Sequence, residues 1–422
     1  MEPARIYMIL VDGTFAILTI INSFLRLSQV ISTYRLLLLR YLVYPVFLHR
    51  HYVLGPWSRF GLLLRLSYLA VNVFFGLFKV TTISEAQLRT GTLSLINLLP
   101  LYLGTHFGFL ADLVGVSIGS FRAIHASSGL MATLLGGTHI ALSVANHVNS
   151  NLQSARQTCG LIVGTAIVME TYANIGQAGI SLTVLLVLSL SLFRRPSYEI
   201  FLRGHQTLAV AILYSLWRHT MGGTNISRLC VYSLLSTLAS TSALEICHCF
   251  YRNFAIGQPC PRAHLTKVNG AVTITLSVPR PWTIKAGQYV NVWIPSVGFW
   301  QSHPFMIAGW TEGQMPSLLL IVEPREGLTR KLVSYAADSE LEPLASQYRL
   351  AFFSGPHGLR VPMGDYGNVL LIASGFGIAA QIPYVKELIR DYHRCKVRTR
   401  RIHLVWQLHD FSKSTSEQEI HS

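Results

Sequence analysis

Four histidines recur at one spacing in two apolar segments of the chain. His125 and His139 are 14 residues apart, and so are His205 and His219. In an α-helix, 14 residues come about 40° short of four full turns and rise about 21 Å, so each pair shares one helix face. Two imidazoles from facing helices supply both axial ligands of a haem iron, which suits electron transfer because no position stays open for a substrate. The repeated spacing predicts two such sites; the alternative is core histidines bonded to backbone carbonyls.

The histidines fall in a part of the chain whose composition indicates a membrane. Of 422 residues, 51% are hydrophobic and 13% are charged, against roughly 25% charged in soluble domains. The first 250 residues hold 16 Lys and Arg and 7 acids. A helix needs about 20 apolar residues to cross the hydrocarbon core, and seven segments approach that length. They are residues 6–25, 61–80, 90–110, 123–145, 171–193, 200–221 and 227–247.

Arginines between these segments predict their orientation. Six lie between the first two segments, and four more lie in or beside the next two loops on the same side. Because Lys and Arg are enriched in cytoplasmic loops, we expect the N-terminus outside and the second half of the chain in the cytosol. His125 would then face His205 near the cytosolic side, and His139 would face His219 farther out. The net charge of +15 is largely an orientation signal, and we expect no nucleic acid partner.

Other candidate residues in this half have simpler interpretations. His106 and His147 have no counterpart at equal spacing, and we interpret them as interfacial residues. The six cysteines form no paired framework, which is typical of a reduced, cytosol-facing protein. Gly129, Gly136 and Gly137 would leave room for a flat macrocycle on the first histidine helix, although glycine in membrane helices also serves close packing.

The sequence pattern changes after Arg252. The alternation in TKVNGAVTITLSV, with Asn269-Gly270 as a turn, predicts a hairpin, and KAGQYVNVWIP and PSLLLIVEP predict further strands. We expect an antiparallel barrel over residues 254–362. NVLLIASGFGIAAQIPYVKELI then predicts a strand, a glycine turn and a helix, with RRIHLVWQL as the next strand of a parallel nucleotide-binding sheet.

Two turns in this half are candidate phosphate sites. SGFGIA follows a strand and opens a helix, where free backbone N–H groups favour an anion; the alternative is an ordinary turn between strand and helix. In EGLTRKL, Gly327 and Thr329 precede a predicted helix. A pyrophosphate could bind there, or the threonine could simply cap the helix.

The order of these motifs resembles the fungal ferric reductase family, which is related to the NADPH oxidases. RTGTLSLINLLPLYLG, the paired histidines and RRPSYEIFLRGHQ are similar to its membrane signature. HPFMIA (303–308) is similar to its flavin motif, GPHG (355–358) to its GPYG, and SGFGIA (374–379) to its glycine-rich nicotinamide turn. The resemblance covers roughly residues 61–410.

The resemblance implies three domains: an α-helical membrane domain with two b-type haems over residues 1–253, a cytosolic FAD-binding β-barrel over 254–362, and the start of an α/β NADPH-binding domain over 363–422. It implies that FAD is held by His303, Pro304, Phe305 and Met306, with Gly327 and Thr329 near its phosphates. It implies NADPH near Gly355, Pro356, Ser374, Gly375, Gly377 and Ile378. Met306 departs from the hydroxyl residue usual in the flavin motif.

The same resemblance implies an activity and a location. Electrons would pass from NADPH to FAD and then singly through two haems to an extracellular ferric or cupric chelate, supporting uptake by a permease. The plasma membrane is the family's usual location, and the vacuolar membrane is the alternative. The equal histidine spacing resembles the reductases; the alternative is a superoxide-generating oxidase, in which the second spacing tends to be one residue shorter.

The chain ends early against the family pattern. About 55 residues remain from the start of the first nucleotide-binding strand, whereas a complete domain has about 100–200. The family's C-terminal cysteine-glycine motif is absent, so we expect a partial NADPH domain and keep a non-catalytic haem-binding subunit as an alternative. A transporter is disfavoured because the apolar segments show no polar midplane pathway beyond the histidines.

Overall fold

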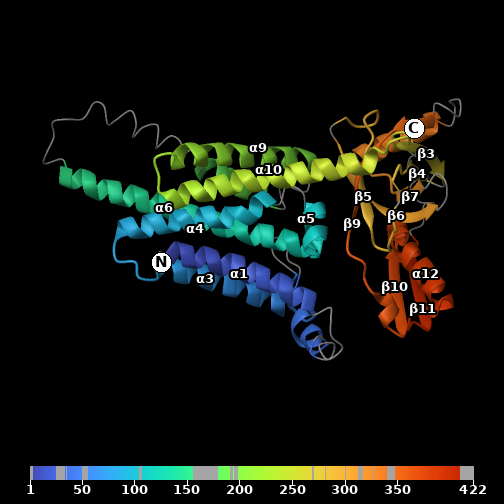
Figure 1. Ribbon diagram of the computed structural model, residues 1–422, viewed down its shortest axis with the longest axis horizontal. Coiled ribbons are helices and arrows are strands. Elements are labelled where there is room, and N and C mark those ends of the chain that lie inside the picture. Colours follow the sequence, from blue (N-terminus) through green and yellow to red (C-terminus); the bar gives the residue numbers. More distant parts are fainter. Residues whose placement is uncertain are drawn as a thin grey trace, which may run out of the picture. The chain divides into compact units, whose positions relative to one another are not determined.

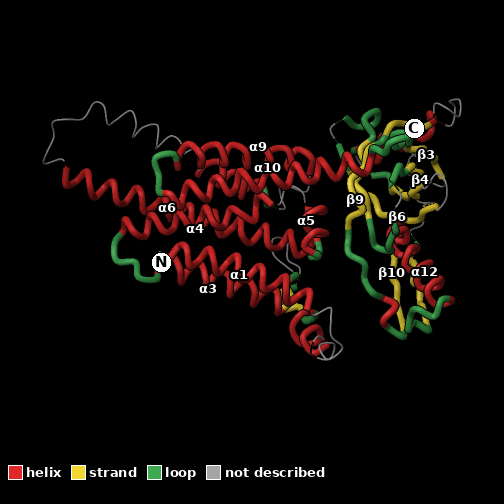
Figure 2. Tube along the Cα trace, viewed as in Figure 1, coloured by secondary structure: helices red, strands yellow, loops and turns green. Residues whose placement is uncertain are grey.

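The computed structural model describes residues 3–24, 34, 36–49, 56–103, 107–154, 179–190, 193, 198–268, 270–280, 282–299, 301–311, 317–325, 327–339 and 347–408. The chain forms two compact units, one comprising Met1–Thr105 and Gly119–Thr241, the other His106–Ile118 and Ser242–Ser422. We call them the helical unit and the strand-rich unit, because Figure 2 shows the long helices in the first and most of the strands in the second.

Long helices make up most of the helical unit (Figure 1). They are α1 (Pro3–Phe24), α3 (Arg59–Leu77), α4 (Ile83–Tyr102), α6 (Ile118–Ser154), α9 (Tyr198–Thr220) and the first part of α10 (Asn225–Asn253). A further apolar helix covers Gly179–Leu188. The smaller elements are a π-helical turn, η1 (Leu39–Val43), and the short paired strands β1 (Val46–Leu48) and β2 (Trp57–Ser58).

Helix α4 begins at side chains that satisfy its first N–H groups. The Thr82 hydroxyl accepts a hydrogen bond from the Glu85 N–H at 3.2 Å, and the Glu85 carboxylate accepts one from the Thr81 N–H at 2.9 Å. This reciprocal arrangement is close to a capping box. The predicted span over residues 90–110 is therefore wrong as a single helix, because α4 starts earlier, at this cap, and ends at Tyr102. A separate helix, α5 (Phe107–Val114), follows.

Apolar packing and a buried polar network hold the helical unit together. Its core cluster is drawn from five helices and includes Tyr7, Leu93, Ala132, Leu213 and Leu234. Within it, the Tyr7 hydroxyl and the Asn97 side-chain amide each donate a hydrogen bond of 2.8 Å to Asn72 Oδ1. Buried polar groups of this kind are expected to be paired, and the pairing ties α1, α3 and α4 to one another.

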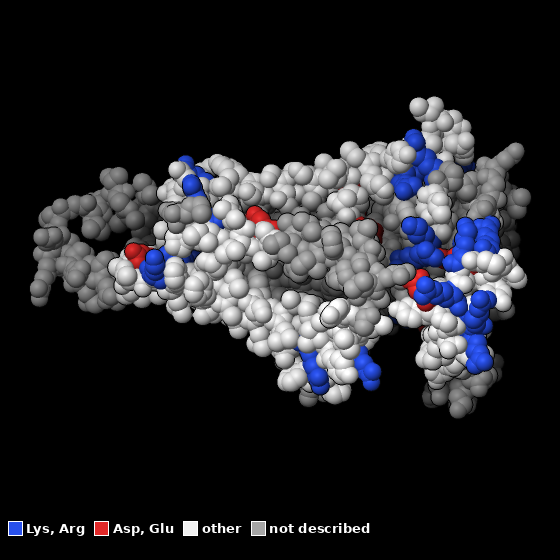
Figure 3. Space-filling model, turned by 60° about the horizontal axis from the view of Figure 1, so that its bottom comes forward, with Lys and Arg blue, Asp and Glu red and all other residues white. Residues whose placement is uncertain are grey.

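Three helices in the described part of the chain are long and apolar enough to cross a membrane: α3, residues 118–146 of α6, and α10. Counting α4 and α5 as one broken span would give four. Much of the visible surface of the helical unit is free of charged side chains (Figure 3), as lipid contact requires. The predicted helical membrane domain is confirmed, whereas the number of seven spans stays a prediction.

Several sequence predictions for this half lie outside the described residues. They include His106, residues 171–178, 191 and 192 of the predicted span over 171–193, and six of the orienting basic residues, namely Arg26, Arg35, Arg50, Arg156, Arg194 and Arg195. The backbone of His147 lies in α6, but its side chain is not among those described.

The strand-rich unit contains a seven-stranded antiparallel sheet. Its strands are β3 (Arg262–Val268), β4 (Ala271–Ser277), β5 (Tyr289–Trp293), β6 (His303–Thr311), β7 (Ser317–Val322), β8 (Tyr348–Leu350) and β9 (Phe352–His357). Their order is β8-β3-β4-β7-β6-β5-β9. Because only Ala351 separates the two edge strands, the sheet curls back on itself as the predicted barrel. Gly270, at φ +77°, forms the predicted turn between β3 and β4.

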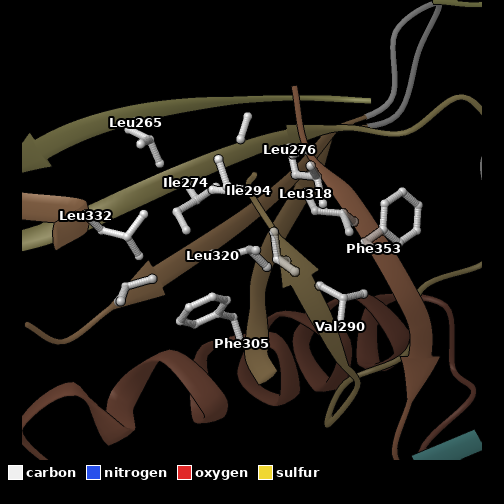
Figure 4. Packing of buried hydrophobic residues seen from close by; sticks show 14 of the residues in the cluster. Leu265, Ile274, Leu276, Val290, Ile294, Phe305, Leu318, Leu320, Leu332 and Phe353 are labelled. Atoms are coloured by element: carbon white, nitrogen blue, oxygen red, sulfur yellow. The ribbon is translucent and has the colours of Figure 1, made fainter. Parts of the chain in front are cut away.

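Alternating burial builds the barrel core. In β4, Val272, Ile274 and Leu276 are all 0% exposed, and the residues between them face outward. Figure 4 shows Ile274, Leu320 and Phe305 in the interior among the other labelled side chains. Helix α11 (Leu328–Ser339) contributes Leu332 to the same cluster.

A βαβ segment follows the barrel within the same unit. A short 3-10 turn, η4 (Met363–Asp365), leads to β10 (Asn368–Ser374), and a second turn, η5 (Gly375–Gly377), leads to α12 (Ile378–His393) and then to β11 (Arg401–Gln407), which lies parallel to β10. Helix α12 packs on the barrel, where the Glu387 carboxylate accepts a hydrogen bond from the Ala286 N–H at 3.0 Å. Burial raises the pKa of the neighbouring Tyr384 phenol. The predicted strand, glycine turn, helix and second strand are thus confirmed.

Candidate functional site

The two histidine pairs predicted from spacing meet in the helical unit. The rings of His125 and His205 have centroids 6.0 Å apart with 39° between their planes. Those of His139 and His219 have centroids 6.3 Å apart with 67° between their planes. Helices α6 and α9 therefore present matching faces with both pairs in register.

These ring separations suit an iron atom between each pair. Metal–imidazole bonds measure about 2 Å, so two ligating nitrogens on opposite sides of one metal lie about 4 Å apart and their ring centres about 6 Å apart. The separations of 6.0 and 6.3 Å match that value. They are too long for stacked rings in contact, and no direct hydrogen bond joins the two rings of either pair among the described contacts.

The number of donors favours haem over a bare metal ion. Among the described residues, no cluster of three or more His, Cys, Asp or Glu side chains could hold a metal. A structural or catalytic zinc ion takes three or four protein ligands, whereas haem brings four nitrogens of its own and needs only two axial ligands. Two-histidine sites inside an apolar bundle therefore fit the macrocycle.

One of the four histidines has its tautomer set by the backbone. His139 Nδ1 lies 2.7 Å from the carbonyl oxygen of Gln87 in α4. A carbonyl can only accept, so Nδ1 carries the proton and Nε2 keeps the lone pair that a metal would bind. Metal-binding histidines commonly donate their second N–H in this way, which also fixes the ring orientation.

A glycine makes this contact possible. A Cβ placed on Gly91 of α4 would lie only 2.7 Å from Nδ1 of His139, closer than real Cβ atoms approach a neighbour. The imidazole therefore occupies the space that any other residue at position 91 would fill. Gly91 lies in RTGTLSLINLLPLYLG, but its role was not predicted because nothing local to that segment indicates what packs against it.

In the described part of the chain, the α9 members of the two pairs show no bond from Nδ1 to a backbone carbonyl. Nδ1 of His205 and Nδ1 of His219 are buried and have no hydrogen-bond partner among the described residues. Buried polar atoms are rarely left unpaired, and each costs about 1–3 kcal/mol. Buried polar atoms without a hydrogen-bond partner are found mainly in side chains with a functional role, such as redox chemistry or catalysis.

The predicted flavin residues lie on one barrel strand, β6, with different orientations. Phe305 is 9% exposed and belongs to the barrel core, so its side chain packs inward and only its backbone is available to a cofactor. His303, Pro304 and Met306 are partly or fully exposed. Met306 pairs in register with Tyr289 of β5.

Gly327 and Thr329 lie at the start of α11, as predicted. Gly327 adopts φ +78°, a conformation that favours glycine. The Thr329 hydroxyl accepts a hydrogen bond from the Arg325 N–H at 2.8 Å. This contact ties the threonine to the loop before α11, while its hydroxyl proton is left to donate elsewhere.

Gly355 and Pro356 form part of a tightly packed turn at the end of β9. Gly355 has φ +128°, and a Cβ there would meet the Tyr289 carbonyl oxygen at 3.2 Å. Gly358 has φ +104°, and a Cβ there would meet the Gly287 carbonyl oxygen at 2.8 Å. Both glycines of GPHG are therefore required by backbone conformation and by close approach of the neighbouring chain.

Ser374, Gly375, Gly377 and Ile378 lie together at the carboxyl end of the parallel strands. Ser374 is paired in register with Gln407 of β11, and α12 begins directly after Gly377 without a side-chain cap. Ligands of parallel α/β sheets bind at this edge, where the helix start offers N–H groups to a phosphate. The structure thus brings together this part of the predicted nicotinamide site.

The contact between Asp112 and the GPHG turn was not predicted from the sequence. Asp112 of α5 contacts the GPHG turn: its carboxylate oxygens lie 2.8 Å from His357 Nδ1 and 2.9 Å from the Gly358 N. Asp112 is one of only 7 acids in the first 250 residues, which is the one signal that could have singled it out.

Comparison with known proteins agrees with this arrangement. Residues 90–216 match the family described as the ferric reductase like transmembrane component, residues 261–361 match an FAD-binding domain, and residues 366–416 match the ferric reductase NAD binding domain. The fold and the matched domains define a membrane protein of the class that binds flavin and nicotinamide cofactors. The predicted set of haem, FAD and NADPH fits these domains.

The relatives come from fungi. The chain is 27% identical to Ferric/cupric reductase transmembrane component 2 of Saccharomyces cerevisiae, over 75% of this chain and 42% of that protein. It is 25% identical to a probable cell surface ferric reductase of Aspergillus oryzae, over 72% and 41%. Among solved structures, a flavohemoglobin from Malassezia yamatoensis shares 13% identity, with a TM-score of 0.33 over 80% of this chain and 79% of that one.

The chain is similar to the ferric reductase family: its three matched regions follow one another in order, and the relatives named above are fungal ferric reductase components. It spans about two fifths of the length of both relatives: 42% of the Saccharomyces cerevisiae protein and 41% of the Aspergillus oryzae protein.

Proposed function

We propose that the chain carries the electron path of a transmembrane ferric- or cupric-chelate reductase. The observation that carries this proposal is the register of α6 and α9, which sets two facing imidazole pairs at 6.0 and 6.3 Å. Two-histidine ligation leaves an iron no open position for a substrate, so the pairs suit electron transfer. The reaction balances when NADPH gives up one hydride, releasing NADP⁺ and a proton as two Fe(III) become two Fe(II).

Each cofactor has a distinct task in this proposal. When bound, the flavin would take two electrons from the nicotinamide and the haems would pass electrons one at a time across the apolar layer. His125, His139, His205 and His219 hold the two haems. Four residues of β6 (His303, Pro304, Phe305 and Met306) hold FAD together with Gly327 and Thr329. Gly355, Pro356, Ser374, Gly375, Gly377 and Ile378 line the nicotinamide site.

We propose the domain boundaries and topology predicted from the sequence. The haem domain covers residues 1–253, the FAD domain 254–362 and the NADPH-binding part 363–422. The arginine bias supports an external N-terminus with the flavin domain in the cytosol. The cell-surface description of the Aspergillus oryzae relative supports the plasma membrane, where an uptake permease would take up the reduced metal.

The test uses the full chain in membranes, loaded with haem and FAD. We expect low-spin bis-imidazole spectra, two haems per chain, and Fe(III)-chelate reduction driven by NADPH. His205→Ala should remove one haem and abolish reduction, whereas the control His393→Ala, at an exposed position of α12, should leave both unchanged. A haem-free or high-spin wild type would overturn the site assignment. Dioxygen consumption is measured in parallel, and dioxygen as the faster acceptor would overturn the metal-chelate assignment.

A further inference from the structure

Helix α5 is fastened to the strand that carries the GPHG turn. His357 is 2% exposed, and its Nδ1 lies 2.8 Å from Asp112 Oδ2. The other oxygen, Oδ1, accepts the Gly358 N–H at 2.9 Å. Because a carboxylate only accepts, His357 Nδ1 carries the proton in this contact. A single side chain of α5 therefore holds two consecutive residues of the turn.

The close approach of α5 has a second structural support. A Cβ on Gly108 would lie 3.0 Å from the Tyr289 hydroxyl oxygen and 3.2 Å from the His357 ring. Leu110 and Ala111 are 5% and 2% exposed. The start of the helix is thus packed against β5 and β9, and the Asp112 contact is not an isolated surface ion pair of the kind that contributes little.

Strand β9 is held at its other end by α10. The Asn253 side chain, 1% exposed, donates to the Phe353 carbonyl oxygen at 2.7 Å and accepts from the Phe353 N–H at 2.9 Å. Asn253 is the last residue of α10, and the chain reaches α10 directly from α9, which carries His205 and His219. The strand is therefore clamped from two sides.

Both helices that contact β9, α5 and α10, are chain neighbours of the helices that carry the paired histidines. Helix α5 ends at Val114, and α6, which carries His125 and His139, begins at Ile118. Asp112 thus binds β9 to the helix before α6, and Asn253 binds it to the helix after α9. The paired hydrogen bonds of Asp112 and Asn253 hold β9 near both of its ends, and with it the GPHG turn.

We propose that Asp112 and His357 form a positioning pair that fastens α5 to the GPHG strand, and so holds the GPHG turn in the conformation that the proposed nicotinamide site needs. The inference rests on the proposed function and deepens it. Neither residue touches a cofactor in this proposal. Asp112 acts through the GPHG turn, which forms part of the proposed nicotinamide site.

The test uses Asp112→Ala and His357→Phe in the full chain, with haem and FAD bound. Hydrogen exchange of the amides of residues 107–116 reports on the clamp without needing activity. We expect exchange at least tenfold faster in Asp112→Ala, which loses both hydrogen bonds, and a smaller increase in His357→Phe, which keeps the bond to the Gly358 N–H. The double variant should exchange no faster than Asp112→Ala, since the His357 bond is already lost there. Asp112→Glu, which retains both oxygens, should restore part of the protection. Asp365→Asn, at an exposed carboxylate of the same unit, is the matched control.

The second readout is the affinity of the full chain for NADP⁺, measured by calorimetric titration with haem and FAD bound. With haem and FAD content equal to wild type, both variants should bind NADP⁺ at least tenfold more weakly. Unchanged exchange or an unchanged NADP⁺ affinity in both variants would overturn the inference. If Asp112→Ala fails to accumulate, the same two measurements on His357→Phe and Asp112→Glu test the inference. A wild type that binds no haem would instead contradict the proposed function, so the two failures are distinguishable.

Discussion

Gly91 of α4 and His139 of α6 are in such close contact that a Cβ at position 91 would lie 2.7 Å from Nδ1 of the imidazole. The same nitrogen reaches the Gln87 carbonyl oxygen, one turn earlier in α4, at 2.7 Å. The glycine and the carbonyl together set where the ring sits and which nitrogen is left for a metal. This relationship leads to the first prediction.

Gly91→Ala should displace the His139 ring and break its bond to Gln87, because the added methyl group overlaps the imidazole. We expect haem content to fall from two per chain towards one, with the His125/His205 haem retained. Haem is measured by its pyridine complex against protein concentration. Gly13→Ala in α1, where a Cβ meets nothing within 4 Å, is the control and should keep both haems.

The four histidines should behave as two pairs rather than four separate residues. Removing either member of a pair leaves one axial ligand, so His125→Ala and His205→Ala should each remove the same haem, and combining them should cause no further loss. His125→Ala with His219→Ala should remove both haems. Spectra of reduced membranes give the content. Equal loss for both double variants would contradict the pairing.

Substitutions at alternate residues of β7 should differ in how much they destabilise the barrel. Leu320 is 0% exposed within the core, while its neighbour Leu319 is 37% exposed on the opposite face. Leu320→Ala should destabilise the barrel by about 2–5 kcal/mol, and FAD should be released at a lower temperature. Leu319→Ala should have a much smaller effect. Flavin fluorescence during heating measures the release, and similar midpoints for both variants would refute the register.

Gly375→Ala tests the turn between β10 and α12. Gly375 has φ +50°, where a residue with a Cβ costs about 1–2 kcal/mol, and the turn precedes the helix start proposed to hold the dinucleotide. We expect weaker NADP⁺ binding by roughly tenfold or more, with haem and FAD content unchanged. Gly367→Ala, where a Cβ meets nothing within 4 Å, should bind as wild type. Calorimetric titration distinguishes the two.

The sequence alone determined the features that depend on spacing and local pattern. Fourteen residues between histidines place both on one helix face whatever surrounds them, and alternation in residues 271–277 determines which side chains of β4 are buried. The order of barrel, glycine turn and helix follows from the same local signals. These predictions agree with the structure because helix and strand periodicity is a property of neighbouring residues.

Only the tertiary structure decided what those elements pack against. Asp112 and His357 are 245 residues apart, and no periodicity relates positions so distant. The fit of His139 beside Gly91 depends on how α4 and α6 approach, which is set by side-chain volumes on both helices. The break between α4 and α5 is of the same kind: apolar composition continues across it, but α5 packs with the barrel strands, because its carboxylate and its small residues match the GPHG turn.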